Sequence, residues 1–565
     1  MVILHPKKSD FSHLDDASRQ IMLDTIAFFE NKGKSKLCED DRNFVWYDDF
    51  LNFVKEKKIF ATLMTPSGYG AEGSRWDTSR IAAFTEILGF YGLCYWYTYQ
   101  VSSLGICPIW IGGNEEAKKK AATLIDAGNI FAFGLSEKEH GADIYSSSMK
   151  LSPDGNGNYI ANGTKYYIGN GNKAAMVSIF GKMEDTNEYV FFAVDSQHPN
   201  YKLEKNVVNS QSYVAAFSLE NYPVSKSDIL EIVSTAWDAA LNTININKYN
   251  LGWGSIGMST HSFYEAINHA SHRNLYGKMV TDFPHIKDLF TKAYTRLLAM
   301  KLFALRATDY MRTASETDRR YLLFNPMVKM KVTTEGEFVM NDLWDVIAAK
   351  GFEKDMFFAM AARDIRALPK LEGTVTVNMA LIIKFMPNYF FFPDQFPEIP
   401  TFNEPVNDTF LFNQGPTKGL GKIKFHDYNI AYNAVDLPNV NIFKEQIAIF
   451  KEALMMASPN EGQQKDLDLL LKIGELFTLV AYGQLILEKV VLFKISDDLT
   501  EQIFDILIND FSKMALSFYQ KASCTPKQME YALKMVKKPV VDAAREERVW
   551  NDHVFALKDS YTMNN

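Results

Sequence analysis

Cysteine is scarce in this sequence, and its placement does not suggest a disulfide framework or a zinc site. The 565 residues include four cysteines, none of which forms a C-x-x-C pair or stands beside a histidine cluster. Ten histidines are scattered along the chain without an H-E-x-x-H motif. Disulfide scaffolds and zinc sites depend on such spacings, so we expect a chain from a reducing compartment without a metal centre.

An excess of positive charge and a long uncharged apolar run are also missing. The formal net charge is −8 and the pI is about 5.8, which disfavours a nucleic-acid partner. Lys384 interrupts the apolar stretch 377–392, and Glu475 and Glu488 interrupt the stretch 469–493, so neither provides the ~20 apolar residues of a membrane span. The N-terminal residues show no leader pattern. We expect a cytoplasmic protein with no membrane span and no nucleic-acid partner.

The composition is that of a folded protein with large cores. Hydrophobic residues make up 47% and charged residues 23% of the chain, and a chain of this length usually holds roughly three or four domains. Apolar residues first recur at helical spacing, after which β-branched and aromatic runs alternate with turn clusters. Helical spacing then returns twice, on either side of a Pro- and Asn-rich interval at 387–421.

This order of textures predicts a segregated α+β fold and not the alternating rhythm of a doubly wound sheet. We predict an N-terminal helical domain, a central antiparallel β domain, a C-terminal helical bundle and an additional helical C-terminal extension. Their predicted bounds are residues 1–126, 127–230, 231–393 and 394–565.

One glycine motif invites a dinucleotide-binding interpretation that its context disfavours. Residues 68–73 fit G-x-G-x-x-G, but that motif binds a dinucleotide within a strand–helix–strand unit. Here helical patterns lie on both sides, so we predict a loop between helices.

Four short segments are weak signals separately and a strong signal together. They are Ser136 to Asp143 (SEKEHGAD), Lys165 to Ala174 (KYYIGNGNKA), Arg273 to Gly277 (RNLYG) and Glu372 to Thr374 (EGT). In this order and spacing they resemble the acyl-CoA dehydrogenase motifs T-E-P-x-x-G-S-D, K-x-W-I-T-N-G-x-x-A, R-x-x-F-G and E-G-T. The resemblance covers roughly residues 16–393.

The resemblance implies FAD as cofactor, held between the β domain and the helical bundle. Leu135 and Ser136 would then hydrogen-bond the flavin ring, Tyr167 would form an aromatic wall against it, and Arg273 would pair with the diphosphate. The residues expected to bind the cofactor are Phe133, Leu135, Ser136, Tyr167, Ile168, Gly169, Arg273, Tyr276, Asp345 and Thr374.

Glu372 is the residue that we expect to be catalytic. Pro369 should end the preceding helix, Gly373 allows a close backbone approach, and Thr374 is a good N-cap for the next helix. The resemblance implies that Glu372 removes the α-proton of an acyl thioester while the β-hydride passes to the flavin N5. Burial beside flavin and acyl chain should raise the pKa of Glu372 toward neutrality.

Several positions depart from the family pattern, most of them on the expected substrate side. Ala142 stands for a Ser, Gly169 for a Thr, and Lys248 for an Arg near the CoA moiety. Asp345, Ala348 and Ala349 stand where a Gln and two Gly usually meet the FAD of a neighbouring subunit. The expected substrate-binding residues are Gly141, Ala142, Lys248 and Gly373. Because the base is retained, the carrier of the acyl group could be either CoA or an acyl carrier protein.

The function predicted on this resemblance is FAD-dependent α,β-dehydrogenation of an acyl thioester in fatty acid metabolism. The expected partner is an electron-transfer flavoprotein, and the expected assembly is a homodimer or homotetramer. Two alternatives stay open. The first is an acyl-CoA oxidase that uses O₂, and the second is a catalytically silent scaffold that binds an acyl carrier.

Overall fold

The N-terminal part of the chain is a group of helices around two buried central ones. The computed structural model describes residues 3–232, 235–401 and 404–565. Helices α5 and α6 are buried along almost their whole lengths. The G-x-G-x-x-G segment lies in the loop between α4 and α5, as predicted, with a helix on each side. The helices are α1 (Asp16–Lys32), α2 (Lys34–Arg42), α3 (Asp48–Glu56), α4 (Ile59–Met64), α5 (Thr78–Tyr91), α6 (Leu93–Ile111) and α7 (Glu115–Asp126).

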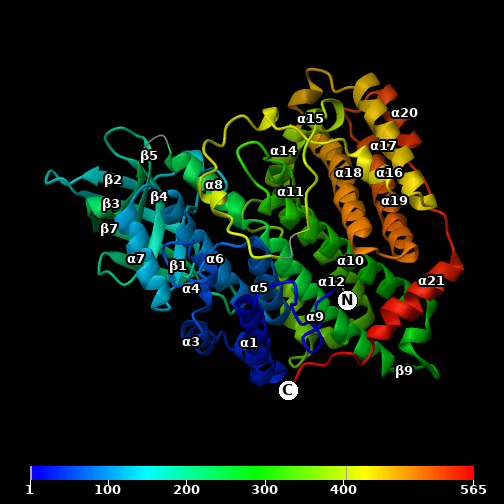
Figure 1. Cartoon of the computed structure of the whole chain (residues 1–565), viewed down its shortest axis with the longest axis horizontal. Helices are drawn as coiled ribbons and strands as arrows, with labels where there is room; N and C mark the ends of the chain where they lie inside the picture. Colours follow the sequence, from blue (N-terminus) through cyan, green and yellow to red (C-terminus); the bar gives the residue numbers. More distant parts are fainter. Residues whose placement is uncertain (1–2, 233–234, 402–403) are drawn as a thin grey trace.

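An eight-stranded sheet follows and forms one end of the molecule (Figure 1). The strand order is β6-β7-β3-β2-β4-β5-β8, and β1 pairs with β4 off this path. The pairs β1–β4 and β2–β4 are parallel, and the other pairs of this sheet are antiparallel. The strands are β1 (Phe131–Gly134), β2 (Lys150–Pro153), β3 (Tyr159–Gly169), β4 (Met176–Met183), β5 (Tyr189–Val194), β6 (Tyr201–Asn206), β7 (Val214–Val224) and β8 (Ile229–Ile232).

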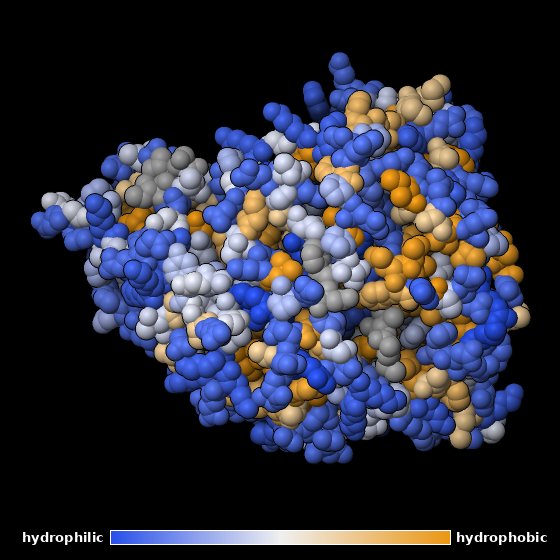
Figure 2. Space-filling model, in the orientation of Figure 1, coloured by the Kyte–Doolittle hydropathy of each residue, from blue (hydrophilic) through white to orange (hydrophobic). Residues whose placement is uncertain are grey.

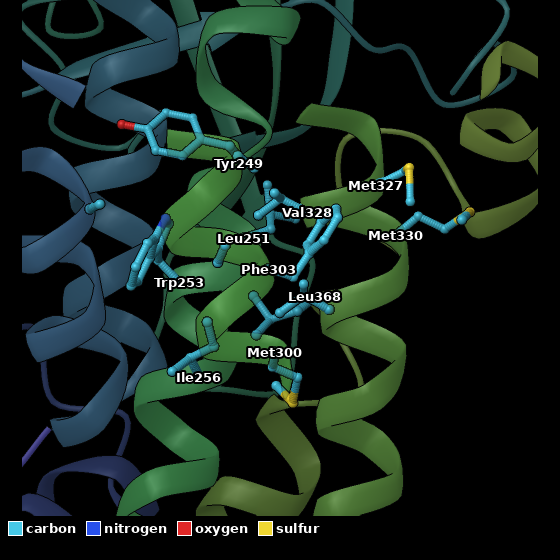
Figure 3. Packing of buried hydrophobic residues seen from close by; sticks show 14 of the residues in the cluster. Tyr249, Leu251, Trp253, Ile256, Met300, Phe303, Met327, Val328, Met330 and Leu368 are labelled. Carbon is cyan, nitrogen blue, oxygen red and sulfur yellow. The ribbon is translucent and has the colours of Figure 1, made fainter. Parts of the chain in front are cut away.

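Long helices then form a bundle with α9 at its centre. Figure 3 shows side chains from neighbouring elements gathered in this core, among them Trp253, Phe303 and Val328. Helices α5 and α9 approach closely, because a Cβ at Gly257 would lie 2.0 Å from the carbonyl oxygen of Glu86. The elements are α8 (Ala236–Asn247), α9 (Asn250–Ser271), β9 (Asn274–Leu275), β10 (Lys278–Met279), α10 (Pro284–Arg312), α11 (Tyr321–Met327), the π-helical turn η4 (Val328–Val332), α12 (Thr333–Ile347), α13 (Phe357–Asp364), α14 (Val375–Ile382) and α15 (Met386–Phe391).

A helical extension completes the chain, so the predicted α+β fold class is confirmed. Contrary to the expectation from its interrupting charges, α18 (Leu467–Phe493) is, among the described residues, long and apolar enough to cross a membrane, but 78% of its most apolar window is buried inside the protein. The C-terminus returns to the first helices, where Tyr561 Oη donates to Glu30 Oε1 at 2.6 Å. The helices are α16 (Asn429–Asn433), α17 (Pro438–Met456), α18 (Leu467–Phe493), α19 (Asp497–Tyr519), α20 (Pro526–Lys534) and α21 (Ala543–Val549).

The extension has an apolar surface as well as an apolar core. Figure 2 shows hydrophobic residues gathered over the side of the molecule where α16 to α19 lie. Its exposed hydrophobic side chains are Ile430, Met455, Met456, Leu467, Val491, Leu492, Phe493, Leu516, Leu533, Val536, Val540 and Val541. The extension therefore covers the bundle and also exposes a hydrophobic surface of its own to solvent.

A buried polar network connects α18 to α10 and to His426, which lies in the segment between α15 and α16. Glu488 of α18 accepts hydrogen bonds from Arg306 Nε at 2.7 Å and from Tyr310 Oη at 3.0 Å. His426 and Gln484 also contact this carboxylate, at 3.3 and 2.8 Å. Burial alone would raise the pKa of Glu488, but the His426 hydrogen bond and the Arg306 charge hold it low, at about 2. The carboxylate is therefore charged and central to the contact.

Replacing Glu488 with glutamine is expected to destabilise the protein by about 1–3 kcal/mol, because buried Arg306 would then depend on Asp309, which lies 3.2 Å away and also pairs with Lys489. The matched change on the same helix is Glu475→Gln, whose partner Lys472 lies in a partly exposed pair. That control should change stability by less than about 0.5 kcal/mol. Urea unfolding followed by circular dichroism measures both. Equal midpoints for the two variants would contradict a role for Glu488 in holding the extension.

Candidate active site

Glu372 lies in the turn that connects α13 and α14, as the sequence predicted. Two consecutive residues have left-handed backbones there, Glu372 with φ +52° and Gly373 with φ +85°. The side chain of Thr374 accepts a hydrogen bond from the backbone N–H of Val377 at 3.4 Å, which confirms the predicted N-cap of α14. A non-glycine residue with positive φ is uncommon and costs free energy, so the turn holds Glu372 in a specific conformation.

The carboxyl group of Glu372 is buried although the residue as a whole is half-exposed. Gln100 Nε2 of α6 donates to Oε1 at 2.5 Å. The other oxygen, Oε2, is buried and has no hydrogen-bond partner among the described residues. Burial raises the pKa of Glu372 to about 7, against the opposing effects of the Gln100 hydrogen bond and the charges of Lys248 and Lys329. The group can therefore gain or lose a proton near neutral pH.

Two buried lysines lie close to Glu372. Lys248 Nζ donates to Asn378 Oδ1 at 3.1 Å, and burial lowers its pKa to about 8. Lys329 Nζ donates to the carbonyl oxygens of Pro369, at 2.7 Å, and Gly373, which fixes the turn from both sides. The structure places Lys248 in the interior beside the carboxyl group, so its contact with a substrate stays a prediction.

Lys329 was not identified from the sequence. Burial and the Lys248 charge lower its pKa to about 7. It lies in the π-helical turn η4, a distortion that is often found at functional sites. A lysine within the apolar run Met327 to Met330 was the available signal, but a single charge in an apolar run is more often a residue at the edge of a core.

The segments around Ser136 and Tyr167 are joined by two hydrogen bonds. Ser136 Oγ donates to the carbonyl oxygen of Tyr166 at 2.7 Å, and the Tyr166 N–H donates back to the carbonyl oxygen of Ser136 at 3.1 Å. A register shift in β3 between Tyr166 and Ile168 leaves Tyr167 unpaired with φ +64° and its side chain 58% exposed. Such a bulge re-aims a side chain, and here it presents an exposed aromatic ring that packs edge-on against Tyr166, with the ring centroids 4.7 Å apart.

A buried ion pair holds the loop that follows Ser136. Lys165 Nζ donates to Glu137 Oε1 at 2.8 Å and to the carbonyl oxygen of Leu135 at 2.9 Å. Glu137 also accepts from the N–H of Ser148 at 2.8 Å. Burial opposes ionisation of Glu137, but the Lys165 charge and hydrogen bonds lower its pKa to about 2. Gly141 and Ala142 lie on the exposed part of this loop. Neither charged partner had an assigned role from the sequence.

Gly169 lies against Tyr97 of α6. A Cβ at Gly169 would lie 2.7 Å from Tyr97 Cε1 and 2.9 Å from Tyr97 Oη, so only glycine fits without movement. Tyr97 is also close enough to Glu372 for that charge, after burial, to raise the tyrosine pKa. The neighbouring Ile168 is buried, and Phe133 stacks on Phe191 with the ring centroids 6.1 Å apart. Tyr97 therefore lies between Gly169 of the β domain and Glu372.

Arg273 belongs to a second cluster, at the β9–β10 hairpin, far from the sheet in Figure 1. The hairpin turn has Tyr276 at φ +53° and Gly277 at φ +77°, and the Tyr276 side chain is 96% exposed. Asp345 is exposed in the last turn of α12. A cavity of about 580 Å³ lies beside the hairpin and is lined by His269, His272, Arg273, Ala348, Ala349, Lys350 and Glu353. The predicted residues thus form two groups that one chain does not bring together.

The second cluster has the charge of an anion site. Arg273 and Lys350 supply positive charge, and Lys350 forms an ion pair with Glu353 at 2.9 Å. Burial and the charges of Arg273 and Lys350 lower the pKa of His269. A bound anion would relieve this repulsion, and a guanidinium can bond two phosphate oxygens at once.

Ala348 retains a backbone conformation that suits glycine. Its φ of +56° and ψ of −144° lie outside the regions that L-residues favour. Replacing Ala348 with glycine is expected to stabilise the protein by about 1 kcal/mol, because released strain exceeds the added flexibility of the unfolded chain. The control is Ala349→Gly, at an ordinary φ, which should destabilise instead. A lower midpoint of thermal unfolding for Ala348→Gly would contradict the strain.

This chain is similar to known proteins by family model, by sequence and by fold. The family model for the C-terminal domain of acyl-CoA dehydrogenase matches residues 236–386. A 3-(aryl)acrylate reductase from Clostridium sporogenes is 25% identical over 348 residues, covering 59% of this chain and 91% of that protein. The caffeyl-CoA reductase-Etf complex subunit CarC from Acetobacterium woodii is 24% identical over 338 residues, covering 57% and 86%.

The fold of the whole chain, extension included, has a solved counterpart. The acyl-CoA dehydrogenase complexed with FAD from Bacillus anthracis superposes with a TM-score of 0.75 at 18% identity, covering 99% of this chain and 97% of that chain. The helical extension is therefore part of a fold that occurs in another protein.

Proposed function

Because this chain belongs to the acyl-CoA dehydrogenase family, we propose that it is an FAD-dependent oxidoreductase that interconverts a saturated acyl thioester and its α,β-unsaturated form. The observation that carries the proposal is Glu372, a buried carboxyl group with a pKa of about 7 and one oxygen that has no hydrogen-bond partner in the described part of the chain. Such a group can move the α-proton of a thioester at neutral pH.

Two features of the chain fit FAD. The exposed ring of Tyr167 offers a flat apolar face, and the adjacent residue Tyr166 is hydrogen-bonded to Ser136. The cavity at Arg273 offers the positive charge that a diphosphate needs. Since these features lie far apart in one chain (Figure 1), we propose that the site forms between two copies, with Arg273 supplied by the second. When bound, FAD supplies the acceptor or donor of the hydride.

Glu372 performs the proton transfer in this proposal. Gln100 holds Oε1 and leaves Oε2 to meet the α-carbon, so the two oxygens have different tasks. An α-proton is weakly acidic, and the thioester carbonyl needs hydrogen-bond donors as negative charge develops on its oxygen. We assign the backbone N–H of Glu372 as one donor, as the family resemblance implies. Lys329 keeps that turn in place through its bonds to Pro369 and Gly373.

An electron-transfer flavoprotein is the proposed redox partner. One relative is named as a subunit of a reductase-Etf complex, which supports transfer of electrons between proteins over transfer to O₂. The two relatives described above are named as reductases, which supports reduction of the unsaturated thioester as the physiological direction. The same Glu372 would then donate the α-proton instead of removing it.

The test is anaerobic spectroscopy of the purified holoprotein. Saturated thioesters on CoA and on acyl carrier protein should bleach the visible absorption of bound flavin, and unsaturated thioesters should restore it after chemical reduction. Rapid reoxidation by air and none by an electron-transfer flavoprotein would favour the oxidase instead. A protein that cannot be loaded with FAD would overturn the proposal and favour the scaffold alternative.

A further inference from the structure

We infer that Lys248 is a positioning residue that acts on Glu372 through Asn378 and shares this task with Lys329, so that Lys248 serves the base and not the carrier of the acyl group. The inference rests on the proposed function, because it concerns the group that moves the α-proton. It is carried by the burial of the two lysines and by the hydrogen bonds that connect them to the turn at residues 369–374.

Lys329 holds this turn directly. Its Nζ donates to the carbonyl oxygen of Pro369 at 2.7 Å and to that of Gly373, so it joins the two ends of the turn. The side chain is fully buried, and the neighbouring residues Val328 and Met330 lie in the hydrophobic core of the bundle (Figure 3). An ammonium group in such surroundings needs hydrogen-bond acceptors and a countercharge.

Lys248 is connected to the same turn through Asn378. Lys248 Nζ donates to Asn378 Oδ1 at 3.1 Å, and Asn378 Nδ2 donates to the carbonyl oxygens of Gly373 at 3.1 Å and Thr374 at 3.0 Å. The carbonyl oxygen of Gly373 therefore accepts from both Lys329 and Asn378, which uses both of its lone pairs. Because Lys248 and Asn378 are both buried, this connection lies in the interior of the protein.

The turn needs such support because its backbone is strained. Glu372 has φ +52° and Gly373 has φ +85°, and a left-handed conformation at a non-glycine residue persists only where the surrounding structure enforces it. The bonded carbonyl groups of Pro369, Gly373 and Thr374 stand on both sides of Glu372 in the sequence. Loss of these bonds would let the turn relax and move the carboxyl group away from Gln100.

Glu372 is also the carboxylate whose charge acts on both lysines. Burial lowers the pKa of Lys248 to about 8, and burial together with the Lys248 charge lowers that of Lys329 to about 7, while the charge of Glu372 opposes both changes. The two lysine charges in turn favour the ionised form of Glu372, against the effect of its burial. Removal of either lysine should therefore raise the pKa of Glu372.

The other titratable groups around this cluster do not replace the two lysines. Tyr97 and Cys107 of α6 are affected by the charge of Glu372, but burial raises the pKa of both far above neutrality, so both stay uncharged. Lys370 is exposed and pairs with Glu337. Lys248 and Lys329 are therefore the buried countercharges that a substitution can remove.

The experiment measures anaerobic bleaching of the flavin in the holoenzyme as a function of pH. The acyl group that bleaches the wild-type flavin is presented on its intact carrier and on pantetheine, which has the same thiol arm without nucleotide or protein. In Lys248→Met we expect kcat to fall by about tenfold or more with both forms, because a displacement of roughly 1 Å can cost ~10²-fold in rate. The pH midpoint of kcat/KM for oxidation should move upward by about one pH unit.

Lys329→Met should show the same two changes with a smaller shift of the midpoint, because Lys329 loses its charge at a lower pH than Lys248. The matched control is Lys331→Met in the same π-helical turn, whose side chain pairs with Glu335 instead. That control should leave the midpoint unchanged. Lys248→Arg retains the charge and the donors, so it should recover most of the lost kcat and restore the midpoint.

Asn378→Leu separates position from charge. It removes the bonds to Gly373 and Thr374 at nearly constant volume and retains both lysines. We therefore expect kcat to fall while the midpoint shifts less than in Lys248→Met. The same variant tests the connection if Lys248→Met does not load FAD, and thermal unfolding of each loaded protein reports whether the fold is retained.

The outcomes separate this inference from the proposed function. A higher KM for the intact carrier alone in Lys248→Met, at unchanged kcat and pH midpoint, would overturn the inference and assign Lys248 to the carrier. Unchanged kcat and midpoint in Asn378→Leu and in both methionine variants would also overturn it. Both results leave the proposed function standing. No bleaching of the wild-type flavin by any thioester would overturn the proposed function, and the inference with it.

Discussion

Replacing Glu372 with glutamine is expected to lower kcat/KM for thioester oxidation by about 10²–10⁴-fold, the usual contribution of a positioned general base. Glutamine has the same shape and can still accept the hydrogen bond from Gln100 Nε2, so the turn and the bound flavin should be unaffected. Stopped-flow bleaching of the flavin under anaerobic conditions measures the loss. An intact flavin spectrum together with lost bleaching would assign the defect to proton transfer and not to folding.

The pH dependence provides an independent check on the same residue. In the oxidation direction the free enzyme needs Glu372 unprotonated, so kcat/KM should rise with pH through a midpoint near the pKa of about 7. In the reduction direction Glu372 must be protonated, so kcat/KM should fall as pH rises through the same range. Opposite slopes in the two directions are the signature of one acid–base group.

Gln100 should set the position of that midpoint. Its hydrogen bond favours the carboxylate and lowers the pKa of Glu372. Gln100→Leu should therefore move the midpoint upward, by up to about one pH unit. An unchanged bleaching rate in Glu372→Gln would show that the base is another residue. A pH midpoint that is the same in Gln100→Leu as in the wild type would show the same.

Local rules were sufficient to place Glu372 and Thr374 correctly. A glycine within the turn and a threonine at the N-cap are short-range signals, and the structure has the expected connection and cap. Pro369 does not end the preceding helix as predicted, because α13 already ends at Asp364. The same holds for the α+β arrangement, because helical and strand periodicity change in separate blocks along the chain. Ser136 and Tyr167 could be paired because four motifs in order carry information that no single motif has.

The long-range partners of these residues could not be predicted from the sequence. Gln100 and Lys329 lie 272 and 43 positions from Glu372 in the sequence. The sequence of an apolar helix does not show which distant residue a polar side chain in it will contact. Two parallel pairings within the sheet were equally hidden, because side-chain alternation along a strand does not say which strand lies beside it. The fit of Tyr97 against Gly169 required coordinates for the same reason.

The separation of Arg273 from Glu372 leads to a prediction about assembly. Arg273→Glu should weaken FAD binding by about 10–100-fold or more, because it replaces a charge-assisted bond to the diphosphate with repulsion. A matched control is Arg366→Glu, whose exposed guanidinium bonds Asn341 outside the cavity. That control should retain FAD. At limiting FAD, Arg273→Glu and Glu372→Gln should therefore each be inactive as homo-oligomers, for different reasons.

Combining the two inactive chains should restore activity. If each site takes Glu372 from one copy and Arg273 from the other, a mixed pair concentrates both defects in one site and leaves the second site intact. Co-expression with two affinity tags and sequential purification isolates such mixed pairs, and about half of the wild-type activity is expected from one intact site of two. If both residues served a site within one chain, every site in the mixed pair would carry one defect and no activity would return. Recovery therefore distinguishes a shared site from two independent ones, and it requires no assumption about which thioester is the natural substrate.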